Sequence, residues 1–102
     1  MKTEGLSYQE AIEFAKAGAM ISRKHWKEHS FVFRQVNNIV HKDMIPNMRS
    51  LPMNVKERLV TVGKSLFYEN QLMVADTSGE RVIITHFEPD WRDEYYKDWY
   101  IL

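Results

Sequence analysis

The residues best suited to chemistry lie in one short polar segment, where Trp26 stands among Arg23, Lys24 and Lys27. A tryptophan ring offers a flat surface on which a nucleobase can stack, an interaction worth about 1–3 kcal/mol. An arginine can hold a phosphate through two parallel hydrogen bonds, whereas a lysine acts as a point charge. The segment could therefore bind a phosphorylated ring. Composition alone favours a second interpretation, in which Trp26 closes one end of the hydrophobic core.

A second polar cluster lies near the C-terminus, where Asp90, Asp93, Glu94 and Asp98 follow His86. Carboxylates beside a histidine could supply a general acid and a general base. Asp90 and Asp93 also have the spacing of a capped helix start, which accounts for both of them without catalysis.

The charges of the 102-residue chain cancel, so no general attraction to nucleic acid is expected. They are unevenly placed, because residues 20–34 sum to +3, with Glu28 as their one acidic member, and residues 88–98 sum to −3. Two interpretations stay open. The two regions could form a complementary solvated surface, or the basic loop could meet the phosphates of a ligand.

Several kinds of site are not expected from this sequence. It has no glycine-rich phosphate loop, no dinucleotide fingerprint and no catalytic-serine or zinc-protease motif. His25 and His29 could share a helix face, but two ligands without a third make a poor metal site, so a solvated or ligand-facing histidine pair is expected instead. The lack of cysteine excludes disulfides and fits a reducing compartment. With no apolar run of membrane-spanning length and no signal-peptide core, a cytoplasmic protein is expected.

The polar segments must be positioned by the helices and strands around them. Ser7 and Glu10 have the spacing of a capping box, and apolar residues then recur at helical spacing, which predicts a helix over residues 8–17. Gly18 is well placed to end it. A second short helix is predicted after Pro52, and a third from Asp90 to about residue 97.

The remaining segments alternate between β-prone runs and turn residues. Glu69 and Asn70 are predicted to form a turn between two of these strands. We therefore expect a small α+β fold, one domain over residues 1–102, with the N-terminal helix and short helices packed on a mostly antiparallel, meandering sheet. The predicted strands are residues 19–23, 30–36, 66–68, 72–75, 81–87 and 99–102.

A set of short motifs occurs in a fixed order along nearly the whole chain: Tyr8-Gln9-Glu10-Ala11-Ile12, Gly18, Ile21, Arg23, Trp26, residues 45–52, Val55-Lys56, residues 68–71, Pro89, Asp93 and Asp98-Trp99-Tyr100-Ile101-Leu102. This order resembles a phage and bacterial family typified by the second Thoeris anti-defence protein. The chain departs from the family's pattern at four places: Phe87 stands where the family usually has tryptophan, Asp90 where it usually has serine, Tyr96 where it commonly has a small residue, and His25-Trp26-Lys27 where it has a glycine-tryptophan-asparagine-like turn.

This resemblance implies a sponge for immune messengers. Members form homotetramers with pockets at subunit interfaces, and they sequester glycocyclic ADP-ribose of Thoeris defence or cyclic oligonucleotides of CBASS defence without cleaving them. No cofactor, metal, catalytic residue, DNA, RNA or membrane is implied, and a phage-encoded member would act in the host cytoplasm. Trp99 is expected in the core. The ligand-binding residues predicted on this basis are Tyr8, Arg23, Trp26, Lys27, Asp93 and Asp98.

Two other functions stay open on the sequence. The first is a phage or mobile-element protein that acts by binding another protein. The second is a hydrolase of the same messengers, which would depend on His86 or on the acidic cluster.

Overall fold

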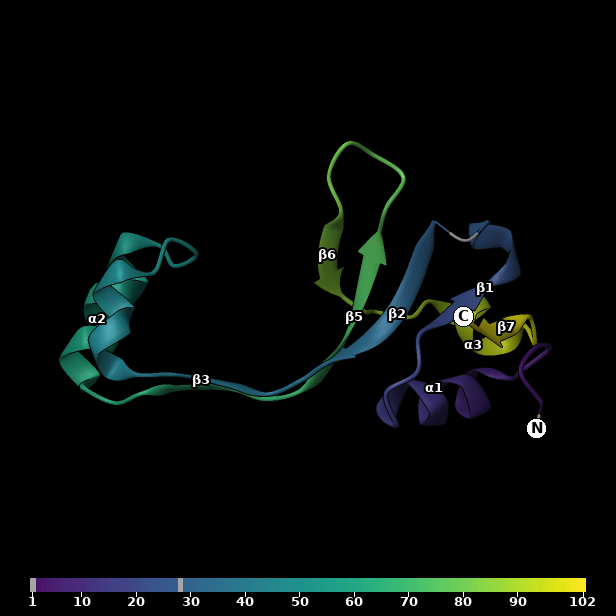
Figure 1. Cartoon of the computed structure of the whole chain (residues 1–102), viewed down its shortest axis with the longest axis horizontal. Coiled ribbons are helices and arrows are strands. Elements are labelled where there is room, and N and C mark those ends of the chain that lie inside the picture. The colour runs from purple at the N-terminus through teal and green to yellow at the C-terminus, as the bar shows by residue number, and fades with distance from the viewer. Residues whose placement is uncertain (1, 28) are drawn as a thin grey trace. The chain divides into compact units, whose positions relative to one another are not determined.

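A computed structural model describes residues 2–27 and 29–102, so Glu28, the acidic member of the basic loop, lies outside the described residues. Contacts divide the chain into two compact units (Figure 1). Unit 1 consists of residues 1–35 and 71–102, and unit 2 is the segment 36–70 between them. The predicted α+β class is confirmed, because helices and antiparallel strands both occur. The single domain stays a prediction.

Unit 1 is built on an antiparallel sheet, which contains five strands among the described residues, in the order β6-β5-β2-β1-β7. The longest ladder joins β2 to β5 and runs from Ser30↔Asp76 to Gln35↔Gln71. The bounds of the elements of unit 1 are α1 Tyr8–Lys16, β1 Ile21–Arg23, the 3-10 turn η1 Lys24–Trp26, β2 Ser30–Gln35, β5 Gln71–Asp76, β6 Ile83–His86, α3 Trp91–Tyr95 and β7 Trp99–Ile101.

Helix α1 confirms the predicted N-terminal helix and its capping box. The Glu10 backbone N–H donates to Ser7 Oγ at 3.2 Å, and the Ser7 backbone N–H donates to Glu10 Oε1 at 3.0 Å. These two bonds satisfy donors that the first helical turn leaves free. After the helix, Gly18 has φ of +108°, a conformation that glycine adopts without strain.

The core of unit 1 is centred on Trp99, which is fully buried, as predicted. Leu6, Ile21 and Val32 are buried around it and belong to the same cluster. Phe87 meets the Trp99 ring edge-on, with ring centroids 6.1 Å apart. The strand that carries Trp99 is therefore held by packing as well as by the sheet. The residues next to Trp99 in the sequence are fixed in position as a result.

Unit 2 contains a two-stranded antiparallel ladder and two helical segments. The predicted turn at Glu69 and Asn70 is wrong, because the strand before it pairs with β3 rather than with β5. Residues 69 and 70 instead connect β4 to β5. The two ladders share one pairing register, because the residue numbers of partners have the same sum in both, as in Gln35↔Gln71 and Asn38↔Tyr68. The elements of unit 2 are β3 Asn38–Val40, the 3-10 helix η2 Lys42–Asn47, α2 Met53–Val62 and β4 Leu66–Tyr68.

Helix α2 confirms the helix predicted after Pro52. Among the helices of the described residues, none combines the length and the apolar character needed to cross a membrane.

Candidate functional site

One pocket of unit 1, with a volume of about 460 Å³, collects most of the predicted ligand-binding residues. It lies where the end of β1, the turn η1 and helix α3 meet the start of β7. Residues far apart in the sequence therefore share it. The pocket is lined by Arg23, His25, Trp26, Asp90, Arg92, Asp93, Tyr96 and Asp98.

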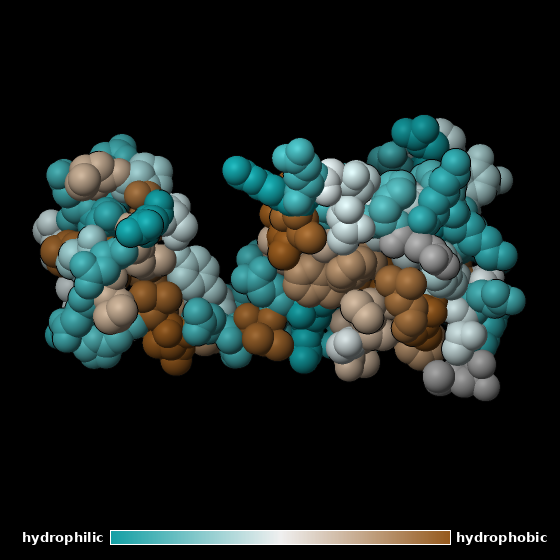
Figure 2. Space-filling model, turned by 45° about the horizontal axis from the view of Figure 1, so that its top comes forward, coloured by the Kyte–Doolittle hydropathy of each residue, from teal (hydrophilic) through white to brown (hydrophobic). Residues whose placement is uncertain are grey.

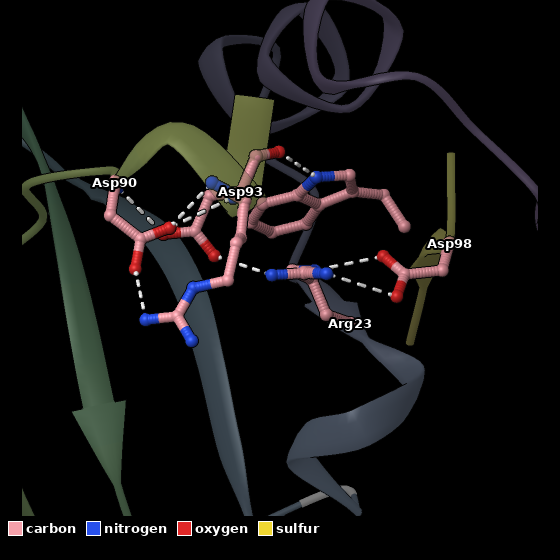
Figure 3. Close-up of polar contacts among 6 residues, drawn as sticks. Arg23, Asp90, Asp93 and Asp98 are labelled. Atoms are coloured by element: carbon pink, nitrogen blue, oxygen red, sulfur yellow. Dashed lines mark hydrogen bonds and ion pairs between the residues drawn. The ribbon is translucent and has the colours of Figure 1, made fainter. Parts of the chain in front are cut away.

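Arg23 is the centre of this site, and its side chain lies between two carboxylates (Figure 3). Nε and Nη2 donate to the two oxygens of Asp98 at 2.8 and 3.1 Å. Nη1 donates to Asp93 Oδ1 at 2.8 Å. Arg23 is only 4% exposed, and Tyr96 stacks on it with 5.6 Å between the guanidinium carbon and the ring centroid. The arginine is thus fixed by four contacts on three sides.

Asp93 is held in place by the helix cap that the sequence predicts. Asp90 caps α3 by accepting from the backbone N–H groups of Arg92 and Asp93, and Asp93 returns a bond to the backbone N–H of Asp90 at 2.9 Å. The indole N–H of Trp99 donates to the backbone oxygen of Asp93 at 2.8 Å. The capping box and the core tryptophan therefore aim Asp93 at Arg23.

Electrostatics favours the charged forms of Asp98, Arg23 and Asp90. The hydrogen bonds from the Arg23 side chain hold the pKa of Asp98 below its usual value. Burial lowers the pKa of Arg23, but hydrogen bonds to Asp98 and Asp93 outweigh it, and the net shift is upward. The pKa of Asp90 is lowered by the backbone N–H of Asp93 and then by Arg92. A carboxylate with a lowered pKa is a weak base, so Asp98 is poorly suited to remove a proton.

The pocket offers acceptors and aromatic surface rather than free positive charge. Its three aspartates and two arginines sum to −1 with His25 neutral. Three of the five N–H donors of Arg23 are used by carboxylates, which leaves two for a ligand. The site can accept hydrogen bonds from hydroxyl or amino groups, while Trp26 and Tyr96 present rings for stacking.

Trp26 satisfies parts of both interpretations drawn from the sequence. Its ring meets the buried Trp99 edge-on, with centroids 5.3 Å apart, so it packs against the edge of the core. The side chain is nevertheless half-buried rather than buried, and it lines the pocket. An indole held on one side by the core presents its remaining surface in a fixed orientation.

Of the six predicted ligand-binding residues, Lys27 and Tyr8 lie apart from the four that line the Arg23 pocket. Lys27 lines a second pocket of about 460 Å³ with Lys24, Glu4 and Tyr100, and its φ of +53° is unusual for a non-glycine residue. Tyr8 packs edge-on against Trp99 at 6.1 Å, and burial raises the pKa of its hydroxyl. His86 is not among the described residues that line either pocket.

Arg92 and Tyr96 are site residues that the sequence reasoning missed, because the acidic helix was interpreted through its cap alone. Their spacing of four residues could have indicated that they share a site, since residues four apart lie on the same side of a helix. Arg92 is in α3, and Tyr96 is the residue that follows it. His25, expected from the sequence to be solvated or ligand-facing rather than a metal ligand, lines the Arg23 pocket. Within the described residues, no group of three or more histidine, aspartate or glutamate side chains lies close enough to hold a metal ion.

Residues 6–102 match the family model described as Tad2-like, the Thoeris anti-defense 2-like domain. No curated protein matches the sequence.

Proposed function

The chain belongs to the Tad2-like family, whose name implies a role against Thoeris defence, and from this premise we propose that it sequesters a nucleotide-derived immune messenger. The messenger is glycocyclic ADP-ribose, a cyclic oligonucleotide, or both, and it is held without being cleaved. The protein acts as a homotetramer in the bacterial cytoplasm, where binding suppresses anti-phage defence. A sponge in excess, with a low dissociation constant, holds the free messenger below the concentration that its effector needs.

The observation that carries this proposal is the half-buried indole of Trp26 beside fixed carboxylates in one pocket. A base can stack on the indole, as many nucleotide-binding surfaces do. Asp93 and Asp98 can accept hydrogen bonds from ribose hydroxyls or an amino group, since Arg23 already fixes the orientation of both.

We expect the phosphates of the messenger to be bound by other groups than the indole that stacks on its base. Arg23 is engaged by two carboxylates, which leaves it two N–H donors for a ligand. Lys24 and Lys27, in the neighbouring pocket, carry exposed ammonium groups that can attract a phosphate. The lowered pKa of Asp98 supports binding over hydrolysis, because it makes that carboxylate a weak general base.

The proposal is tested by recovery of the ligand. The purified protein is incubated with glycocyclic ADP-ribose or with a panel of cyclic di- and trinucleotides, the free ligand is washed away, and the protein is denatured. Intact messenger, at a fixed ratio to protein, is the expected result. A cleaved product would instead favour the hydrolase. Failure to retain any nucleotide, together with capture of one host protein, would favour the protein-binding function.

Replacing Asp90 by serine, the residue usual in the family, is expected to tighten binding of an anionic messenger by roughly three- to tenfold. The change removes a negative charge from the pocket and releases Arg92, whose Nη2 now donates to Asp90 Oδ2 at 3.2 Å. Serine caps a helix about as well as aspartate does, so the urea midpoint should hardly move. Calorimetric titration measures the affinity.

The control is Asp43→Ser in unit 2, which removes the same charge from a residue outside the Arg23 pocket. It should leave the affinity unchanged. Weaker binding by Asp90→Ser would mean that the aspartate accepts a hydrogen bond from the ligand, contrary to this assignment.

A further inference from the structure

The two edges of the sheet in unit 1 are treated differently by the chain. The outer side of β7 is covered by the N-terminal segment: Leu6 and Trp99 exchange backbone hydrogen bonds at 2.9 and 3.2 Å, and Ile101 donates to the Thr3 oxygen at 2.9 Å. Strand β6 forms the opposite edge, and among the described residues only β5 pairs with it. One edge is therefore closed within the chain, while the other presents free backbone groups.

The open edge is also unusually apolar. Val82, Ile83 and Ile84 are 58%, 59% and 51% exposed, although they follow one another at the edge of a sheet. Proteins ordinarily protect such an edge with lysine, proline or a bulge, because exposed backbone and apolar side chains pair with other strands. Residues 82–85 contain no charge and no proline. Apolar side chains reach the surface of unit 1 in the space-filling view (Figure 2).

The apolar surface continues inward from the edge on one face of the sheet. Directly paired residues in adjacent strands share a face, and the pairs Phe31↔Ala75 and Ala75↔Ile84 form one row across β2, β5 and β6. Phe31 packs beside Phe33 with ring centroids 6.0 Å apart. The row therefore ends at Ile84, on the open edge.

We propose that β6 is a subunit interface, in which it pairs antiparallel with β6 of a second copy about a two-fold axis at Ile84. The two sheets then form one continuous sheet, and the row Phe31–Ala75–Ile84 continues into the same row of the partner. This inference rests on the assembly of identical chains in the proposed function, and it names the surface that joins them.

The backbone directions fix which residues pair. The Phe87 N–H donates to the Leu72 oxygen at 3.1 Å, on the β5 side. Because backbone groups alternate in direction along an antiparallel strand, those of Ile84 and His86 point away from β5. A two-fold axis at Ile84 places these outward groups opposite each other, with Ile84 facing Ile84 of the second copy and Val82 facing His86.

The charges around the strand favour antiparallel over parallel pairing of two copies. Arg81 precedes the strand and Glu88 follows it, with Glu80 in the bend one residue further out. In the register centred on Ile84, Glu88 of one chain stands opposite Glu80 of the other, and Arg81 lies one position from that pair. Each end thus holds an arginine near the two glutamates, whereas parallel in-register pairing would set every flanking charge against its own copy. The uncharged centre, Val82 to Thr85, imposes no repulsion on its own copy, and its β-branched side chains pair well across strands.

The test uses opposite charges at the axis. Ile84→Lys and Ile84→Glu each place two like charges face to face, so each variant alone should sediment at half the wild-type mass, with association weakened about 100-fold or more. An equal mixture of the two should recover the wild-type mass, because lysine then faces glutamate. Val62→Lys, a change of a comparably exposed apolar residue on α2, is the matched control and should keep the wild-type mass.

Circular dichroism confirms that each variant is folded. A wild-type chain that stays monomeric at high concentration overturns both the interface and the proposed assembly. A wild-type oligomer whose mass is unchanged by Ile84→Lys overturns the interface alone, as does a mixture that stays dissociated. Titration with the messenger is run separately on each variant, so loss of nucleotide binding is not mistaken for loss of the interface.

Discussion

Replacing Arg23 by methionine should lower the free energy of unfolding by about 3 kcal/mol. Removing one partner of a buried ion pair costs about 3–5 kcal/mol, because the charges left behind are no longer compensated. Here Asp93 and Asp98 both lose their partner, and the lower end of that range applies since the Asp98 side chain is 30% exposed. For a domain of this size, 1 kcal/mol corresponds to about 4–8 °C in Tm. Urea unfolding measures the change.

The matched control is Arg92→Met in the same pocket. Arg92 pairs with Asp90 at 3.2 Å, but its side chain is 62% exposed, and exposed ion pairs contribute little. The urea midpoint of this variant should therefore stay near that of the wild type. Equal losses for the two variants would show that Arg23 acts through general packing and not through its buried charge.

The pH dependence separates charge from packing. In the wild type, the lowered pKa of Asp98 gives a stabilisation that is complete above the unfolded pKa of about 3.9 and is lost as the pH falls through the folded pKa. Arg23→Met lacks this contribution. The difference in stability between the two proteins should thus narrow as the pH falls below about 4. A constant difference would contradict the ion-pair explanation.

Replacing Trp26 by alanine should weaken messenger binding by roughly 10- to 100-fold, because stacking of a base on an aromatic ring is worth about 1–3 kcal/mol. Loss of its edge-on contact with Trp99 should also cost about 1 kcal/mol of stability, which leaves the protein folded. Calorimetric titration gives the affinity, and urea unfolding gives the stability.

Trp91→Ala is the control for Trp26→Ala. Trp91 is 66% exposed and is not among the described residues that line the Arg23 pocket. Both variants lose an indole, so a loss of affinity in Trp26→Ala but not in Trp91→Ala would show that the Arg23 pocket binds the messenger. If both variants bind the messenger as the wild type does, Trp26 contributes to the core alone and the binding site must be sought elsewhere.

Local signals in the sequence predicted the elements that carry the site. The spacing of Ser7 and Glu10, and that of Asp90 and Asp93, each predicted a helix start, and both capping boxes are formed. A cap is decided by backbone groups within four residues, so it can be derived from sequence. The pairing of β4 with β3 was missed because it depends on residues far apart in the chain, beyond the reach of a turn signal at Glu69 and Asn70.

The charge pattern was informative but ambiguous. A basic segment and an acidic segment of equal and opposite charge fitted either mutual pairing or a ligand's phosphates. Arg23 pairs with Asp93 and Asp98, at 70 and 75 residues' separation. Lys24 and Lys27 line another pocket instead. The register of β1 on β7 decides which cation forms the ion pairs within the chain. Its pair Arg23↔Trp99 places the end of β1 beside the residue after Asp98.

The ladder between β2 and β5 ends at the pair Gln35↔Gln71, where unit 2 begins and ends. Its two attachment points are thus neighbours across one ladder, and the entropy of closing a loop changes slowly with loop length. We therefore expect that unit 2 can be lengthened, shortened or replaced by a two-residue turn while β1, β2, β5 and β7 keep their register. Variation in that segment need not be transmitted to the residues around Arg23.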